Sequence, residues 1–202
     1  AGGQVNALAL VGTDLYVGGA FTAYRGAVAN RIARVSATGV MDTVFSPATG
    51  ANGANNTVSA MTTDGTDVYL GGAFTTYRGA VANRVARIST AGVLNVTFSP
   101  ATGSNGANST VSALAYDGTS LYIAGAFTTY RGTAANRVTK VTLSGSKDTT
   151  FSPNSGANGA DSTVNAIAWS TVASRLLIGG AFYNYRGVGC QFFGVLQANG
   201  VK

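Results

Sequence analysis

The chain repeats one unit of about 53 residues four times. The string LYVGGAFTAYRG at residues 15–26 returns with few changes at residues 68–79, 121–132 and 176–187. Equivalent phenylalanines mark the same place in each copy, at spacings of 53, 53 and 55 residues: Phe21, Phe74, Phe127 and Phe182. A fixed period of this size is typical of an array of small structural units that stack on one another. The repeats therefore constrain the architecture far more than they constrain the activity.

Each copy predicts four short antiparallel strands and shows no helical periodicity. In the second copy, residues 58–61 begin a strand that ends at the Asp64-Gly65 turn. Residues 68–74 alternate large apolar side chains with a smaller face that includes Gly71, which lets another sheet approach closely. Residues 77–80 predict a loop, residues 84–88 a third strand, and residues 93–98 a fourth that Pro100 and a Gly/Asn-rich stretch bring to an end.

Four-stranded sheets about 50 residues apart are typical of a β-propeller. We therefore predict an all-β fold, with residues 1–202 forming one propeller domain whose repeats span about 1–53, 54–106, 107–159 and 160–202. A closed ring of four blades is the leading geometry. An open array that completes a larger ring with other chains is the alternative.

These motifs resemble those of the delta-60 repeat β-propeller family over nearly the whole chain. The resemblance rests on the GGAFTTYRG and NRVARI strings and on DTTFSP at residues 148–153, followed by a Gly/Asn-rich loop. The first turn of that family typically contains DG, which Asp64-Gly65 and Asp117-Gly118 match and Val11-Gly12 does not. The resemblance implies a propeller fold and occurrence in bacterial surface proteins and phage-like proteins. It supplies no catalytic residue.

The inventory of acids and bases is thin. The chain has no His and no Glu, and all seven acidic residues are Asp. General acid–base catalysis near neutral pH most often uses His or a tuned Glu, and Cys190, the only cysteine, can form neither an internal disulfide nor a Cys-based zinc site. We expect no catalytic residue, no metal and no cofactor. The alternative is a hydrolase that uses the pairs Asp64/Asp67 or Asp148/Asp161, for instance on glycosides.

The net charge of +6 raises the question of nucleic acid binding. Most of the positive residues, however, recur at fixed places of the repeat instead of forming one basic stripe. We expect them to hold loops by hydrogen bonds or by stacking on tyrosine, with no nucleic acid partner. No run of 18 apolar residues is present, so no membrane span is expected.

A Tyr-Arg pair recurs in every copy and is the candidate ligand-binding site: Tyr24, Arg25, Tyr77, Arg78, Tyr130, Arg131, Tyr185 and Arg186. Aromatic and guanidinium groups together suit sugars and anionic ligands, but a structural lock between loops would recur in the same way. The polar Gly/Asn loops at residues 50–57, 103–110 and 156–163 are either binding loops or solvated connectors. Calcium at Asp161 is a weak possibility, because the other copies have Asn at that position.

The fourth copy departs from the others. Phe192 and Val195 stand where the first copy has Arg31 and Arg34, and Phe193 adds a further aromatic side chain. The change fits either an end blade adapted to its neighbours or an apolar patch that docks another subunit. The fourth strand is also missing from this copy, and an open strand edge invites pairing. We therefore predict an assembly interface at Phe192, Phe193 and Val195, with a second copy or another protein chain as the partner.

Together these observations favour a non-enzymatic propeller at the outside of a cell or virion. It would act as a structural piece or as a receptor-binding or adhesive module, and a glycan or a surface receptor is a possible partner. The low share of charged residues, 10 %, suits such proteins.

Overall fold

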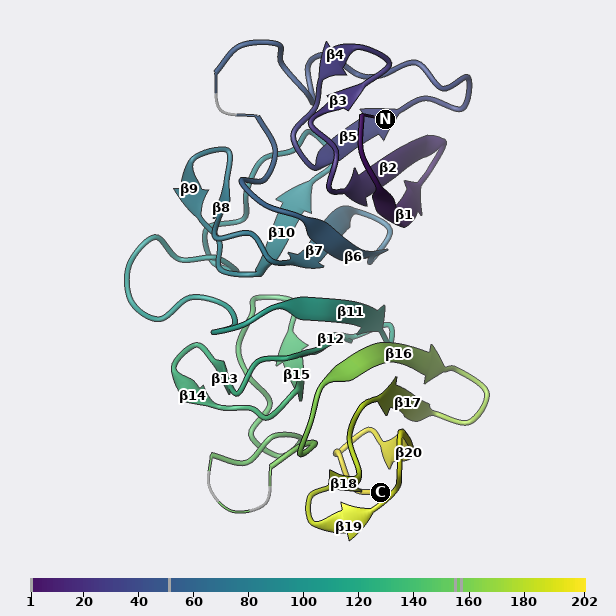
Figure 1. Cartoon of the computed structure of the whole chain (residues 1–202), viewed down its shortest axis with the longest axis vertical. Coiled ribbons are helices and arrows are strands. Elements are labelled where there is room, and N and C mark those ends of the chain that lie inside the picture. The colour runs from purple at the N-terminus through teal and green to yellow at the C-terminus, as the bar shows by residue number, and fades with distance from the viewer. Residues whose placement is uncertain (1, 51, 155, 157) are drawn as a thin grey trace.

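A computed structural model describes residues 2–50, 52–154, 156 and 158–202 of the protein (Figure 1). Across these ranges the chain consists of short strands joined by turns, and the all-β fold class is confirmed. The described part includes no helix that could cross a membrane.

Each repeat forms one three-stranded antiparallel sheet, which we call a blade and number 1 to 4 in chain order. The first strands of the blades are β1 (Val5–Val11), β6 (Val58–Thr63), β11 (Val111–Tyr116) and β16 (Val164–Ser170). The second strands are β2 (Asp14–Gly19), β7 (Asp67–Gly72), β12 (Ser120–Gly125) and β17 (Arg175–Gly180). The third strands are β5 (Ile32–Val35), β10 (Val85–Ser89), β15 (Val138–Thr142) and β20 (Phe193–Gln197). The second strand lies in the middle of each sheet.

The YRG motif forms a small hairpin between the second and third strands, where the sequence predicts a loop. The paired strands are β3 (Ala23–Tyr24) with β4 (Ala27–Val28), β8 (Thr76–Tyr77) with β9 (Ala80–Val81), β13 (Thr129–Tyr130) with β14 (Thr133–Ala134), and β18 (Asn184–Tyr185) with β19 (Val188–Gly189). In each hairpin the Arg and the Gly at the turn both have positive φ, for example 46° at Arg78 and 79° at Gly79. Two residues of positive φ are what a type I′ hairpin turn requires. An arginine in this region is uncommon.

The prediction of a fourth strand at residues 93–98 is wrong, because this segment pairs at one residue only. Residues 93–98 make only a single β-bridge, Ile88 to Leu94, and then turn. The reason is local: the side-chain oxygen of Asn95 accepts hydrogen bonds from the backbone N–H groups of Thr97 (3.1 Å) and Phe98 (3.0 Å). Such an Asx turn competes with strand pairing. Since blades 1 and 3 show the same single bridge, a missing fourth strand does not distinguish blade 4.

The hydrophobic core lies mainly between successive blades. At each of the three junctions a buried tyrosine of the second strand meets a buried phenylalanine edge to face: Tyr16 with Phe45, Tyr69 with Phe98, and Tyr122 with Phe151, at centroid distances of 5.5, 5.8 and 5.4 Å. Such pairs add to the stabilisation that burial already provides. The surrounding core joins neighbouring blades, since Tyr16 and Phe45 of the first repeat cluster with Leu70 and Phe74 of the second. Blades therefore stabilise one another chiefly through their faces.

The four blades form an open array in place of the closed ring. They follow one another along the long axis of the molecule, and blades 1 and 4 lie at its opposite ends (Figure 1). The first strands pack from blade to blade, β1 on β6, β6 on β11, and β11 on β16. The leading closed-ring geometry is thus wrong, whereas completion of a larger ring by other chains stays a prediction. Among the described residues, one face of blade 1 and one face of blade 4 have no neighbouring blade.

Candidate functional site

The Tyr-Arg hairpins of blades 2, 3 and 4 form hydrogen bonds with the preceding blade. The guanidinium of Arg131 donates hydrogen bonds to the backbone oxygens of Phe98 (2.7 Å) and Thr97 (3.0 Å) in blade 2. Arg78 donates to the Phe45 oxygen and Arg186 to the Phe151 oxygen in the same way. Arg25 has the same φ without such bonds, so the hairpin turn sets the backbone and the bonds attach the turn to the preceding blade.

The tyrosines of the same three hairpins are buried. Tyr77, Tyr130 and Tyr185 are at most 1 % exposed, and the Tyr130 hydroxyl donates to the Gly145 oxygen at 3.1 Å. Their rings are therefore unavailable for stacking on a sugar. The contacts account for the recurrence of the motif as a lock between blades, while a ligand-binding role for it stays a prediction.

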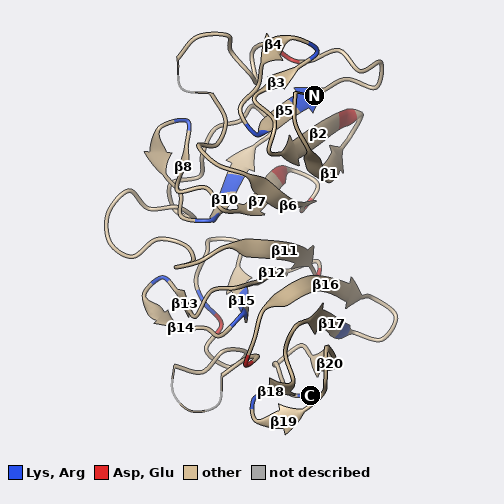
Figure 2. Ribbon diagram, in the orientation of Figure 1, with Lys and Arg blue, Asp and Glu red and all other residues tan. Residues whose placement is uncertain are grey.

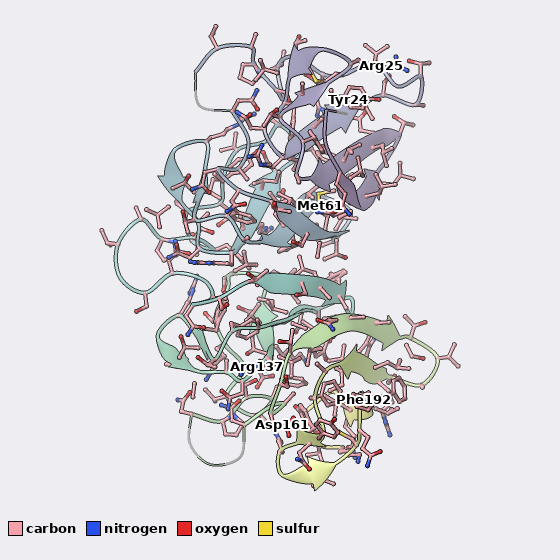
Figure 3. All side chains as sticks on the ribbon, viewed as in Figure 1. Tyr24, Arg25, Met61, Arg137, Asp161 and Phe192 are labelled. Atoms are coloured by element: carbon pink, nitrogen blue, oxygen red, sulfur yellow. The ribbon has the colours of Figure 1, made fainter. Side chains whose placement is uncertain are left out.

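The pair in blade 1 has a different environment. Arg25 is exposed, and Tyr24 is half-buried with its hydroxyl donating to the Gly39 oxygen at 3.3 Å. Both lie at the outer end of the molecule (Figure 3). Within the described residues no blade precedes this hairpin, and Arg25 is exposed whereas Arg78, Arg131 and Arg186 are half-buried.

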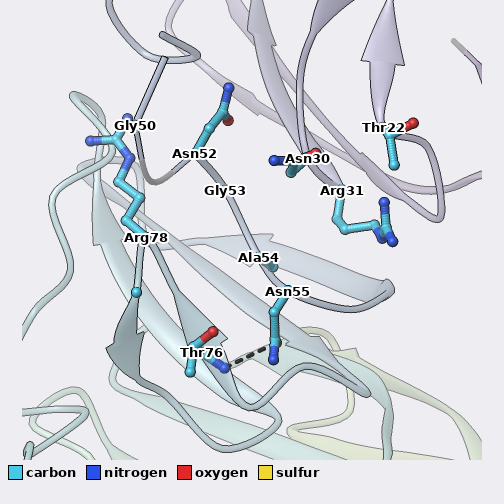
Figure 4. Close-up of a pocket in the computed structure, with 11 residues that line it drawn as sticks. Thr22, Asn30, Arg31, Gly50, Asn52, Gly53, Ala54, Asn55, Thr76 and Arg78 are labelled. Carbon is cyan, nitrogen blue, oxygen red and sulfur yellow. Dashed lines mark hydrogen bonds between the residues drawn. The ribbon is translucent and has the colours of Figure 1, made fainter. Parts of the chain in front are cut away.

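Polar pockets recur at the junctions between blades. The first has a volume of about 360 Å³ and lies between blades 1 and 2, with Asn30 and Arg31 from one blade and Thr76 and Arg78 from the next (Figure 4). A pocket of about 370 Å³ between blades 3 and 4 is lined by the equivalent Asn136 and Arg186. Equivalent residues thus build equivalent pockets at two junctions.

The Gly/Asn loops form one wall of each pocket, and three of their asparagines are structural. The amide nitrogen of Asn105 donates to the Pro100 oxygen (2.8 Å) and the Val81 oxygen (3.2 Å), and Asn52 and Asn158 make the equivalent bonds. All three are buried, which was not expected from the sequence. The sequence signal that could have indicated this burial is the presence of an asparagine at the same position of all three loops. Residues 51 and 157 of the first and third loops lie outside the described residues.

The candidate calcium residue, Asp161, is engaged by protein donors. Its two carboxylate oxygens accept hydrogen bonds from the backbone N–H groups of Tyr183 (2.9 Å) and Asn184 (3.1 Å). The Asn184 side-chain bond and these backbone bonds lower the pKa of Asp161. In the described ranges, no group of three Cys or Asp side chains comes together as a potential metal site.

The aspartate pairs of the hydrolase alternative are turn residues. The Asp64 carboxylate accepts hydrogen bonds from the backbone N–H groups of Thr66 (2.9 Å) and Asp67 (2.8 Å) and from the Tyr69 hydroxyl (2.8 Å). Burial raises the pKa of Asp64, but these bonds outweigh it and bring the pKa to about 2. Asp67 pairs with Arg87 at 2.7 Å. Asp148 accepts the N–H groups of the turn that follows it, at 2.8 and 3.1 Å.

The Lys and Arg residues are spread over all four blades (Figure 2). At equivalent positions of the third strands, Arg34 pairs with Asp42, Arg87 with Asp67, and Lys140 lies 3.6 Å from Asp117. Arg34 and Arg87 also donate to backbone oxygens of the next blade, each at 2.7 Å. These positions join blades.

The three predicted interface residues lie together in blade 4. Phe193 and Val195 are 54 % and 42 % exposed on strand β20. Phe192 precedes the strand with a φ of 67°, and its ring packs on exposed Tyr183 at a centroid distance of 5.0 Å. A bulky residue in this backbone region is an outlier. Phe192 has the φ that Arg31, Arg84 and Arg137 have at the same position of the other copies.

Comparisons with known proteins agree on the class of repeat. A family model described as a domain of unknown function (DUF5122) beta-propeller matches residues 15–45, 67–98 and 120–151, which is just under half of the chain. These matches support a β-propeller repeat without distinguishing the delta-60 repeat family. None of the curated proteins matches the chain.

One solved structure shares the fold at low sequence identity. The computationally designed Ika4 protein is 13 % identical, with a TM-score of 0.54, over 96 % of this chain and 91 % of its own. The Mitotic Checkpoint Complex has a chain that is 13 % identical, with a TM-score of 0.49, over 88 % of this chain and 46 % of its own.

Proposed function

Since three of the four repeats match a β-propeller family model, we propose that this propeller is a non-enzymatic receptor-binding or adhesive module at the outside of a cell or virion. The observation that carries the proposal is the recurrence of one polar pocket at equivalent junctions between blades. A rigid scaffold that repeats a pocket can bind a repetitive ligand at several points.

The chemistry of the pockets suits a glycan. Their walls combine asparagine amides and arginine guanidinium groups with the hydroxyls of Thr22 and Thr76 in the first pocket. Amides and hydroxyls both donate and accept hydrogen bonds, as sugar hydroxyls do, and a guanidinium matches a carboxylate or sulfate on an acidic sugar. Several weak pockets on one chain gain strength together when the ligand repeats.

The state of the aspartates favours binding over catalysis. A general acid needs a pKa near the working pH, whereas the pKa of Asp64 is about 2. Asp161 is next to a pocket, but its oxygens accept hydrogen bonds from Tyr183, Asn184 and the Asn184 side chain. Turn formation explains both residues without a reaction.

The surface location rests on composition and on the delta-60 resemblance. A surface built from Gly, Ser, Thr and Asn with only 10 % charged residues is common among exported and virion proteins. The delta-60 repeat family, which the motifs resemble, occurs in bacterial surface and phage-like proteins.

The test is a glycan array probed with the chain and with a double variant, Asn30→Ala with Asn136→Ala. These residues line the two pockets, and among the described residues neither side chain makes a hydrogen bond that joins blades. We expect the array signal to fall by more than about tenfold while the free energy of unfolding stays within about 0.5 kcal/mol. Val172→Ala, at a 98 % exposed turn far from both pockets in sequence, is the control and should bind normally.

Two results would contradict the proposal. One is an array on which the unmodified chain and the double variant give the same signal. The other is hydrolysis of a glycan or ester panel that Asp64→Asn abolishes, which would restore the hydrolase alternative.

A further inference from the structure

Two of the three junctions between blades have a knob and a glycine notch, whereas the third has the small Ala124 at the position of the glycine. A Cβ atom added to Gly18 of blade 1 would lie 2.8 Å from Val58 Cγ1 and 3.0 Å from Met61 Sδ of blade 2. Real Cβ atoms do not approach other atoms so closely, so the glycine leaves room for the next blade. Gly71 forms the same notch in blade 2, where an added Cβ would lie 2.6 Å from Val111 Cγ1. Figure 3 shows Met61 at the first of these junctions.

Blade 4 has the notch without a knob. Its equivalent residue is Gly179, where an added Cβ would meet only the Phe192 backbone oxygen, at 3.8 Å. The surrounding apolar side chains, with Gly179, make up what we call the tail face: Ala166, Ala168, Leu177, Gly179, Phe193 and Val195. An apolar hollow of about 340 Å³ lies on it.

Blade 1 has the knob without a notch. Val5, Leu8 and Leu10, which we call the head face, are 43 %, 58 % and 62 % exposed. Their counterparts in blade 2 are Val58, which is fully buried, and Met61, which packs into the core between blades. The head face therefore has the shape that fits a glycine notch such as Gly179.

The junction between blades 3 and 4 shows which side chains would meet if a head face packed on a tail face. There Trp169, the counterpart of Leu10, stacks on Tyr122, the counterpart of Leu177, with centroids 5.4 Å apart. Transferred to the free faces, this geometry places Leu10 against Leu177 and places Val5 and Leu8 over Gly179. Both contacts join apolar groups.

The tail face is more apolar than its internal counterparts. On this face, Leu177 and Val195 replace the tyrosine and the basic residue that join the other blades, Tyr16 and Arg34 in blade 1. The head face keeps the apolar character of the internal first strands, but its Val5, Leu8 and Leu10 are exposed. End repeats that face solvent normally carry a polar outer surface. Two exposed apolar faces therefore indicate that both are covered.

We propose that a second copy of this chain covers them, head face on tail face at both ends, to close an eight-bladed ring. The two faces lie at opposite ends of the molecule, so one copy cannot join its own ends (Figure 1). The contact is heterologous, and a twofold axis repeats it twice and leaves no free face. Eight blades is within the usual range for propellers, whereas three copies would make twelve. This inference concerns assembly and stands independently of the proposed ligand.

The test is the molar mass of the 202-residue chain by light scattering across a range of concentrations. We expect twice 20.3 kDa, and a monomer at all concentrations or an open-ended series of polymers would overturn the proposal. Gly179→Leu fills the notch, and its Cβ comes no closer than 3.8 Å to the Phe192 backbone oxygen. Leu8→Asp places a charge on the knob. Each should give a folded monomer, as circular dichroism and thermal unfolding would verify.

Two controls make the result specific. Leu8→Met copies the Met61 of the internal junction, so this variant should remain a dimer. A mixture of the Gly179→Leu and Leu8→Asp chains restores one intact head-to-tail contact, and it should form a one-to-one complex weaker than the original ring. If Leu8→Met dissociates the ring, or if the mixture stays monomeric, the head-to-tail arrangement is wrong.

Discussion

Arg131 and Arg25 occupy the same hairpin turn in different surroundings, and this contrast yields a quantitative prediction. Both have positive φ, 46° at Arg131 and 47° at Arg25. Arg131 donates hydrogen bonds to two backbone oxygens of blade 2, whereas Arg25 is exposed at the outer end of blade 1. Substitution of each by Asn, which tolerates positive φ well, separates the cost of the turn from the value of the bonds.

The expected magnitudes follow from these contacts. Arg25→Asn relieves backbone strain and loses no hydrogen bond to another blade within the described residues, so it should leave stability unchanged or raise it by up to about 1 kcal/mol. Arg131→Asn gains the same relief but loses charge-assisted hydrogen bonds worth about 1.5–3 kcal/mol. Because the strain cancels between the variants, they should differ by about 1.5–3 kcal/mol.

The assay is denaturant unfolding of both variants at one protein concentration, in a Gly179→Leu background so that association does not contribute. In a chain of this size the difference corresponds to about 3–12 °C in melting temperature. Equal effects of the two substitutions would refute the conclusion that the arginines lock blades together. Such a result would favour a ligand-binding role for the Tyr-Arg motif over a structural one.

Three further predictions concern the junctions and the turn at Asp64. Gly71→Ala should cost about 1–3 kcal/mol of stability, whereas Gly179→Ala in the monomeric chain should change it by less than about 0.5 kcal/mol; equal costs would contradict the open notch. Phe98→Ala should cost about 3–5 kcal/mol in the same unfolding assay, because the buried ring fills the space between blades 2 and 3, and a cost below about 1 kcal/mol would place the core elsewhere. The pKa of Asp64 is lowered from 3.8 to about 2, so its contribution of about 2 kcal/mol is complete above about pH 4 and is lost as the pH falls towards 2. Asp64→Asn should therefore destabilise the chain at pH 7 and have little effect near pH 2, and a pH-independent difference would contradict this assignment.

Much of the fold could be predicted from the sequence because the residue pattern of each strand occurs in several copies. Alternation around Gly71 predicted a second strand with a face that allows close approach, and the structure confirms both the strand and the contact with Val111. The fourth strand was wrong because Asn95 forms an Asx turn, a local competitor that apolar alternation does not reveal.

Other features depend on partners distant in the chain. No local rule predicts the hydrogen bond of Arg78, because the carbonyl that accepts it belongs to Phe45 of another repeat. The substitutions at Phe193 and Val195 marked the fourth copy as different, yet only the stacked blades show that these residues lie on an open face beside the notch at Gly179. Whether four blades close a ring depends on the angle between blades, which one repeat does not encode in any simple pattern.

Electron microscopy of the 202-residue chain would test the central claim most directly. Averaged end-on views should show closed rings of eight blades with twofold symmetry, and Gly179→Leu should convert them to open arcs of four. Closed rings of four blades, or open arcs in the unmodified chain, would contradict the account.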